Sequence, residues 1–84
     1  MSIPKVSIEQ VKAARALLRW SQNDLASASG VSIPTIKRLE ANTGNLGGRD
    51  ATVDSIRAAL ETGGVEFIAE NGGGVGVKLR EKNG

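Results

Sequence analysis

Apolar side chains near the start of the chain recur with the period of a helix. Ile8, Val11 and Leu18 fall on one helix face, which predicts a helix from residue 7 to about residue 20. Arg15 lies within this apolar stripe. Residues 1–6 precede the pattern, so we expect a flexible start to the chain.

Local signals at helix ends divide the following segment into two short helices. A serine whose third following residue returns a bond to its amide forms a capping box, and a proline in the first helical turn needs no amide partner. These N-terminal signals are Ser7 with Gln10, Ser21 with Asp24, and Ser32 with Pro34. Gly30 ends the second helix near residue 29, because glycine adopts the left-handed conformation without strain. The third helix is expected to reach about Ala41.

The second half of the chain predicts a loop, a fourth helix and a β-hairpin. Residues 42–50 are rich in turn formers, and a helix is expected over about residues 53–62 before a glycine pair. The inward positions of this helix are Val53, Ile56 and Leu60. The period then changes to two, as in a half-buried strand, and the alternating apolar positions are Val75, Val77 and Leu79. Residues 65–70 are the expected partner strand, and the glycine-rich residues 71–74 the turn.

Composition limits the chemistry that these elements can carry. The 84 residues suffice for one domain, and 39% hydrophobic against 2% aromatic residues predicts an aliphatic core, with Trp20 and Phe67 as its large aromatic side chains. Cysteine, histidine and tyrosine are absent, which excludes disulfides, Cys-based zinc sites and imidazole general bases. We therefore expect neither an enzyme nor a bound cofactor or metal ion.

Charge and hydropathy bear on location and partners. The N-terminus lacks the basic and apolar regions of an export signal, and no stretch has the roughly 20 apolar residues of a membrane span, so a cytoplasmic protein is expected. The net charge of +2 is by itself weak support for nucleic-acid binding. The distribution of the cations must therefore decide the question.

The second and third helices have the spacing of a helix-turn-helix that runs from Gln22 to Ala41. Four apolar residues are expected to hold the two helices at a fixed angle, while a small residue lets the backbones approach and a glycine makes the turn. In that order, these residues are Leu25, Val31, Ile36 and Leu39, then Ala26, then Gly30.

The outward face of the third helix is the candidate surface for reading DNA. This face carries the adjacent cations Lys37 and Arg38, beside an apolar tip formed by Ile33 and Pro34. Apolar groups suit thymine methyls, and cations suit guanine edges and phosphates in a major groove. A helix end that is apolar by chance is the alternative interpretation.

Several short segments resemble the helix-turn-helix family of phage Cro proteins and repressors, the XRE-like family. The resemblance is carried by Trp20-Ser21-Gln22, Leu25-Ala26, Ser29-Gly30-Val31-Ser32 and Thr35-Ile36-Lys37-Arg38-Leu39-Glu40. It covers about residues 11–60 and implies a mainly α, lambda-repressor-like domain of four or five helices. The C-terminal β-hairpin lies outside the common core of the family. The expected division is therefore a DNA-binding domain over residues 7–63 and a hairpin extension over residues 64–84.

The resemblance also implies roles for individual residues. Those nearest the bases are Ser32, Ile33, Pro34, Lys37 and Arg38. Those placed to contact phosphates are Gln22, Thr35, Asn42, Thr43 and Asn45. Family members often carry a polar side chain where Ile33 stands, which argues against hydrogen-bonded adenine recognition at that position. The family also commonly joins the positions of Arg15 and Glu40 by an ion pair, which is expected here.

These features predict sequence-specific binding of double-stranded DNA by a small transcriptional regulator, a repressor acting as a homodimer. The hairpin edge is a candidate dimer seam, and otherwise packs on the helices. One alternative is an antitoxin-like regulator whose hairpin binds a partner protein. A second alternative is a protein-interaction module of the same fold that does not bind DNA, against which Lys37 and Arg38 argue.

Overall fold

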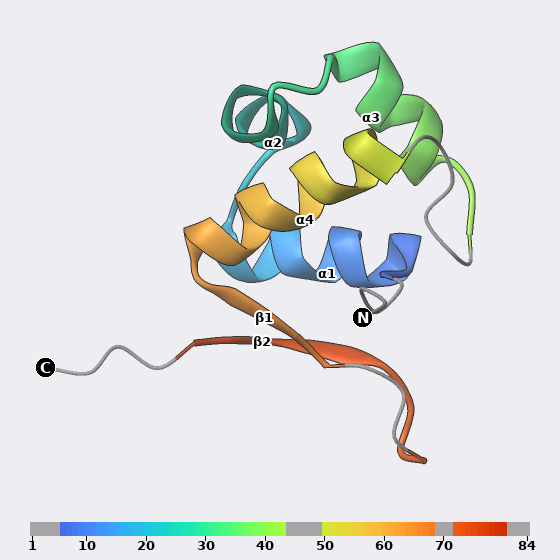
Figure 1. Cartoon of the computed structure of the whole chain (residues 1–84), viewed down its shortest axis with the longest axis vertical. Coiled ribbons are helices and arrows are strands. Elements are labelled where there is room, and N and C mark those ends of the chain that lie inside the picture. The colour runs from blue at the N-terminus through green and yellow to red at the C-terminus, as the bar shows by residue number, and fades with distance from the viewer. Residues whose placement is uncertain (1–5, 44–49, 69–71, 81–84) are drawn as a thin grey trace, which may run out of the picture.

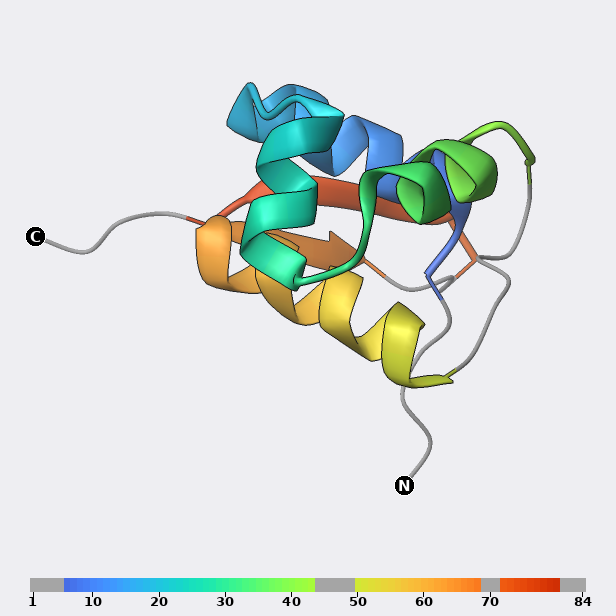
Figure 2. The same cartoon turned by 90° about the horizontal axis from the view of Figure 1, so that it is seen from above.

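Four helices and a two-stranded antiparallel sheet make up the part of the chain that the computed structural model describes, residues 6–43, 50–68 and 72–80. In chain order the elements are α1 (Ile8–Leu18), α2 (Gln22–Ser29), α3 (Ile33–Glu40), α4 (Asp50–Gly63), β1 (Val65–Ile68) and β2 (Gly76–Leu79). Helices α2 and α3 form one end of the molecule and the hairpin forms the opposite end, with α1 and α4 between them (Figures 1 and 2). The predicted class is confirmed, with four helices rather than five in the described residues.

The core is aliphatic, as the composition predicts, and every helix and the first strand contribute to it. Its buried residues are Val6, Val11, Ala14, Leu25, Ile36, Leu39, Ile56, Ala59, Leu60 and Val65. Trp20 and Phe67 are half-buried at its edge. The assignment of residue 6 to a flexible start is wrong, because Val6 is only 3% exposed and packs into this core.

The predicted N-terminal signals of the first three helices are present. Both capping boxes form, and the Ser32 hydroxyl accepts a bond from the amide of Thr35. Gly30 has a φ of 76°, the left-handed conformation that ends α2. These contacts join residues two to four positions apart, which is why sequence alone identifies them.

The end of α1 differs from the prediction by two residues. The helix ends at Leu18, and Arg19 adopts a left-handed conformation with a φ of 59°. The amide of Trp20 donates to the Arg15 carbonyl and the amide of Arg19 donates to the Ala16 carbonyl, at 2.8 and 3.1 Å. This pair of bonds is a Schellman motif, and it ends the helix. It does so at Arg19, although the side chain of a non-glycine residue disfavours the left-handed conformation.

The fourth helix and the hairpin also differ in part from the prediction. Helix α4 begins at Asp50, ahead of Val53, the first inward apolar position, from which the sequence predicted its start. Strand β1 is described over Val65–Ile68, and residues 69 and 70 of the predicted strand lie outside the described residues. Val77 is half-buried as expected, but Val75, before β2, and Leu79, at its end, are 51% and 49% exposed.

The hairpin packs on α1 and α4 through one of its faces. Val65 lies opposite Leu79 and Phe67 lies opposite Val77, and residues opposite each other in an antiparallel pair share a face. Of these, Val65 is buried, and Phe67 and Val77 pack partly buried against the core. Gly72 and Gly74, before β2, have positive φ angles of 98° and 93°, in keeping with the predicted glycine turn.

Gln10 ties the hairpin to the first helix. Its buried amide nitrogen donates to the carbonyls of Ile68 and Gly76, at 3.2 and 2.9 Å, and so bridges the two strands. Its amide oxygen accepts from the Ser7 backbone within the capping box. One side chain therefore starts α1 and holds the hairpin against it.

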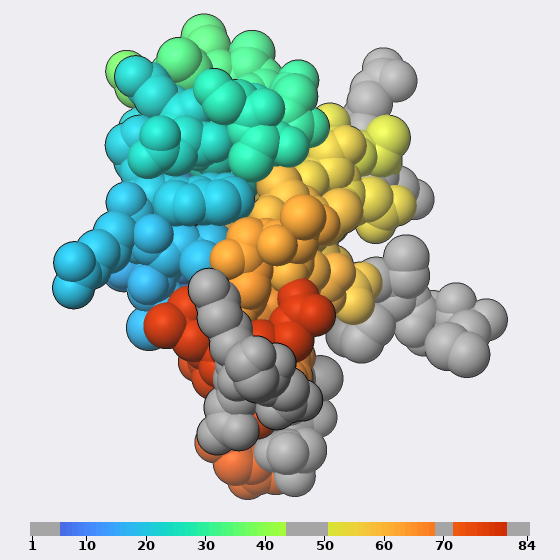
Figure 3. Space-filling model, turned by 90° about the vertical axis from the view of Figure 1, so that its left-hand side faces the viewer, coloured from blue at the N-terminus to red at the C-terminus, as the bar shows by residue number. Residues whose placement is uncertain are grey.

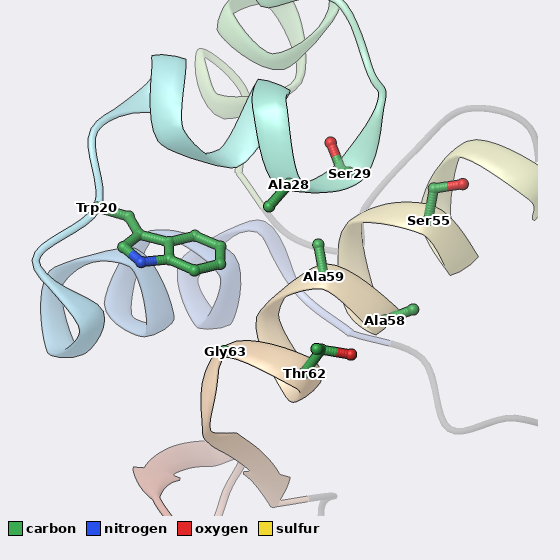
Figure 4. Close-up of a pocket in the computed structure, with 8 residues that line it drawn as sticks. All are labelled: Trp20, Ala28, Ser29, Ser55, Ala58, Ala59, Thr62 and Gly63. Atoms are coloured by element: carbon green, nitrogen blue, oxygen red, sulfur yellow. The ribbon is translucent and has the colours of Figure 1, made fainter.

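Trp20 packs against the last turn of α4. Figure 4 shows its indole pointing from the connection between α1 and α2 toward α4. A methyl group added at Gly63 would lie 2.8 Å from Cζ2 of the indole and 3.0 Å from Cδ1 of Leu18. The absence of a side chain at Gly63 thus allows this close contact.

We expect the substitution Gly63→Ala to destabilise the protein by about 1 kcal/mol. Overpacking costs about 1 to 3 kcal/mol, and the better helix propensity of alanine returns about 0.5 to 1 kcal/mol. Denaturant unfolding would measure the change. The same substitution in a Trp20→Leu background, which lacks the ring atoms, should cost less, and an equal cost in both backgrounds would contradict this account.

Candidate nucleic-acid interface

Helix α3 separates its buried and exposed residues as the helix-turn-helix spacing predicts. Ile36, Leu39 and Glu40 are buried. Pro34 is exposed at the start of the helix, and Ile33 beside it is half-buried. The cations Lys37 and Arg38 are exposed in the last turn, and Ser32 and Ala41, the residues that flank the helix, are exposed as well. The outward face therefore combines an apolar tip with two adjacent positive charges.

The start of α3 is held by a hydroxyl pair. The Ser32 hydroxyl donates to Oγ1 of Thr35 at 2.8 Å and accepts from the Thr35 amide at 3.4 Å. Ser32 is exposed and Thr35 is half-buried.

The residues expected to contact phosphates come from both ends of the motif. Gln22 is the first residue of α2 and is half-buried. Asn42 and Thr43 are exposed after α3, and the Asn42 side chain donates to the Arg38 carbonyl at 3.0 Å. This bond uses one of the two amide hydrogens of Asn42, so the second can be donated to a phosphate. Asn45 lies outside the described residues.

Arg15 and Glu40 form the ion pair that the family resemblance implies. Nε and Nη2 of Arg15 donate to the two carboxylate oxygens of Glu40, at 2.8 and 2.6 Å, in a bidentate arrangement. Nη1 of Arg15 donates to the Trp20 carbonyl at 2.9 Å. The side chains are 19% and 6% exposed, so the pair is largely removed from water. The pair joins α1 to the end of α3.

The environment of the pair favours its charged form. Burial raises the pKa of Glu40, but hydrogen bonds from Arg15 and Gln22, with the charges of Arg15 and Lys12, outweigh it and lower the pKa below the usual 4.5. The hydrogen bond to Glu40 raises the pKa of Arg15. Both shifts mean that folding favours the ion pair over the neutral groups.

The lowered pKa of Glu40 predicts a pH-dependent contribution to stability. The ionised carboxylate favours the folded state, so its contribution is complete well above the ordinary pKa of 4.5 and is lost as pH falls below that value. Wild type should be more stable than a Glu40→Gln variant at pH 7, and the difference should shrink below about pH 4.5. Thermal unfolding between about pH 3 and pH 7, a range that brackets the ordinary carboxyl pKa values, would measure it. A constant difference across this range would contradict the prediction.

A concave surface lies between α2 and α4. It has a volume of about 520 Å³ and is lined by Trp20, Gly63 and mainly small side chains such as Ala28, Ser55 and Ala58. Figure 3 shows this side, where the surfaces of α2 and α4 meet between α3 and the hairpin. It lacks the cations of the outward face of α3.

The described residues contain no group of three or more His, Cys, Asp or Glu side chains that could hold a metal ion. None of the helices in this part of the chain has the length and apolar character needed to cross a membrane.

Comparison with known proteins agrees with this geometry. Residues 11–66 match the model of a family described as helix-turn-helix, the Cro/C1-type, XRE-like family. The chain belongs to this family. The match covers α1 to α4 and reaches the start of β1, so the domain is a DNA-binding helix-turn-helix regulator. No curated protein matches the chain closely enough to be counted as a relative.

Two contacts at the helix ends were not predicted from the sequence. The first is the link from Gln10 to the hairpin, since the capping box explained the glutamine without it. The second is a bond of 3.1 Å from Nε2 of Gln22 to Oε1 of Glu40. The helix-turn-helix spacing brings the start of α2 near the end of α3, which is the signal that could have indicated this second contact.

Proposed function

We propose that the chain is a repressor that binds a specific operator in double-stranded DNA as a homodimer. The observation that carries the proposal is the outward face of α3, where Lys37 and Arg38 are exposed beside Ile33 and Pro34. A cation reads guanine edges and an apolar tip contacts thymine methyls when a helix enters the major groove. Repression then follows sterically, because a bound regulator blocks the promoter.

The contacts with DNA are divided between bases and backbone. The residues that we assign to bases are Ser32, Ile33, Pro34, Lys37 and Arg38. The residues that we assign to phosphates are Gln22, Thr35, Asn42 and Thr43, with Asn45 in the same segment. Four of the five residues assigned to bases are exposed, and Ile33 is half-buried, which supports this division. The position of Gln22 at a helix N-terminus supports its contact with a phosphate.

The proposed dimer predicts the form of the operator. Helix-turn-helix dimers bind two half-sites about 34 to 36 Å apart, which is one turn of DNA. Selection from a random DNA pool followed by footprinting should yield a pseudo-palindrome with two protected half-sites. A single unrepeated site would contradict the dimer, and no enriched site would contradict the operator.

We assign the dimer seam to the hairpin. A two-stranded sheet has unpaired edges, and Val75 and Leu79 are about half exposed before and at the end of β2. The double substitution Val75→Arg/Leu79→Arg should shift the mass observed in sedimentation from dimer toward monomer. Leu17→Arg, on the exposed side of α1, should leave the mass unchanged. An unchanged mass would contradict this seam. Copurification of a different protein with wild type, lost in the double variant, would instead favour the antitoxin-like alternative.

A further inference from the structure

The Glu40 carboxylate lies where three helices meet. It belongs to the end of α3, accepts two bonds from Arg15 on α1, and accepts a third from Nε2 of Gln22 at the start of α2. Its side chain is only 6% exposed, so these donors replace water around it. A buried charge at the end of α3 thus contacts the residue that we assign to a phosphate.

A carboxylate selects one of the two orientations of a glutamine amide. An ionised carboxylate only accepts hydrogen bonds, so it binds the nitrogen of Gln22 and not the oxygen. The nitrogen carries two hydrogens, and this bond uses one of them. A phosphate also only accepts, so the second hydrogen on the same nitrogen is the group that can bind it. The reversed amide would turn its oxygen toward the phosphate and repel it.

Arg15 holds the Glu40 carboxylate that orients the Gln22 amide. Its guanidinium makes two bonds to Glu40 and a third to the Trp20 carbonyl, which holds both side chains in one arrangement. Arg15 also balances the negative charge of Glu40, which would otherwise repel a nearby phosphate. The amide of Gln22 is therefore oriented by a neutral pair.

We propose that Glu40, held by Arg15, is a positioning residue for DNA binding that presents the amide nitrogen of Gln22 to a backbone phosphate. The inference rests on the phosphate contact proposed for Gln22. Ordering one long side chain before binding is worth about a twofold to twelvefold gain in affinity. This is the part of the Gln22 contribution that should depend on Glu40.

The test is a double-mutant cycle between Gln22 and the ion pair. The pair is replaced as a unit by Arg15→Met/Glu40→Leu, which leaves the net charge unchanged and avoids an unpaired buried charge. The affinity for a random DNA duplex is measured by fluorescence anisotropy at one salt concentration, with and without Gln22→Ala. We expect Gln22→Ala to weaken binding several-fold in wild type and by less than about twofold without the pair.

A matched control separates positioning from a general disturbance of α3. Lys37→Ala removes a contact from the same helix that does not involve Glu40, so it should weaken binding by the same factor in both backgrounds. If Gln22→Ala has an equal effect with and without the pair, the positioning role is wrong and the phosphate contact stands. If Gln22→Ala has no effect in wild type, the phosphate contact is wrong and the positioning role with it. If wild type does not bind duplex DNA, the proposed function itself fails.

A second variant and a second measurement cover the case in which the apolar pair does not fold. Glu40→Asp keeps a carboxylate near Arg15 but withdraws it from Gln22, and it should also remove the dependence on Gln22. Without DNA, ¹⁵N relaxation should show an ordered Gln22 side-chain amide in wild type and a mobile one in Glu40→Asp. A merely structural role of Glu40 would leave this signal unchanged and would overturn the proposal.

Discussion

Replacing Lys37 and Arg38 together by alanine is expected to weaken binding to an operator by about thirtyfold or more. Each specific contact between a cation and a base edge contributes about 1 to 3 kcal/mol of discrimination, and two are removed. Both side chains are exposed in the last turn of α3, so their loss should leave the fold intact. The effect should therefore appear in affinity and not in the melting temperature.

Salt titration by fluorescence anisotropy would measure this effect and identify its origin. If both cations contact phosphates, the slope of log K against log salt should fall in magnitude by about 1.8. If both cations contact bases, the ratio of operator affinity to random-DNA affinity should fall, and the salt slope should change less. The matched control is Lys78→Ala/Arg80→Ala, which removes the same charge from the hairpin, at the end of the molecule opposite α3 (Figure 1). Because both residues flank Leu79 in the proposed dimer seam, sedimentation must first show that this variant keeps the mass of wild type. Equal losses in the two variants would show that net charge, and not the face of α3, governs binding.

The substitution Glu40→Ala is expected to be the most destabilising single change at the interface. It leaves the Arg15 guanidinium without its bidentate partner, and breaking a buried pair costs about 3 to 5 kcal/mol. Arg15 keeps 19% of its side-chain exposure, which places the expected loss at the lower end, about 3 kcal/mol. For a domain of this size the melting temperature should fall by more than about 10 °C.

Thermal unfolding at neutral pH would measure this loss, and a double replacement would explain it. Arg15→Met/Glu40→Leu removes both charges and should recover most of the stability, because the cost lies in the unpaired guanidinium. An unchanged melting temperature in Glu40→Ala would mean that the pair does not contribute to the fold. A double variant as unstable as Glu40→Ala would mean that lost packing, and not charge, is the cause.

Much of the helical part of this protein could be predicted from near neighbours in the chain. The capping boxes at Ser7 and Ser21 and the left-handed Gly30 are all present. Each of these features depends on backbone groups within four residues, whose geometry the local sequence controls. The outward position of Lys37 and Arg38 follows from the helical period in the same way, because Ile36 and Leu39 must turn inward.

The tertiary structure alone decided which side chains from different elements contact one another. The Gln10 amide meets strand carbonyls 58 and 66 residues away, and the indole of Trp20 meets the last turn of α4 at Gly63. The bond between Gln22 and Glu40 likewise spans 18 residues and exists only because α2 and α3 cross where Arg15 holds the carboxylate. The sequence by itself therefore determined which segments are helical and which face of α3 is charged, since both depend on local hydrogen bonds and on periodicity. Packing of the helices and the hairpin around one aliphatic core determined which side chains meet, since such contacts depend on the positions of elements far apart in the chain.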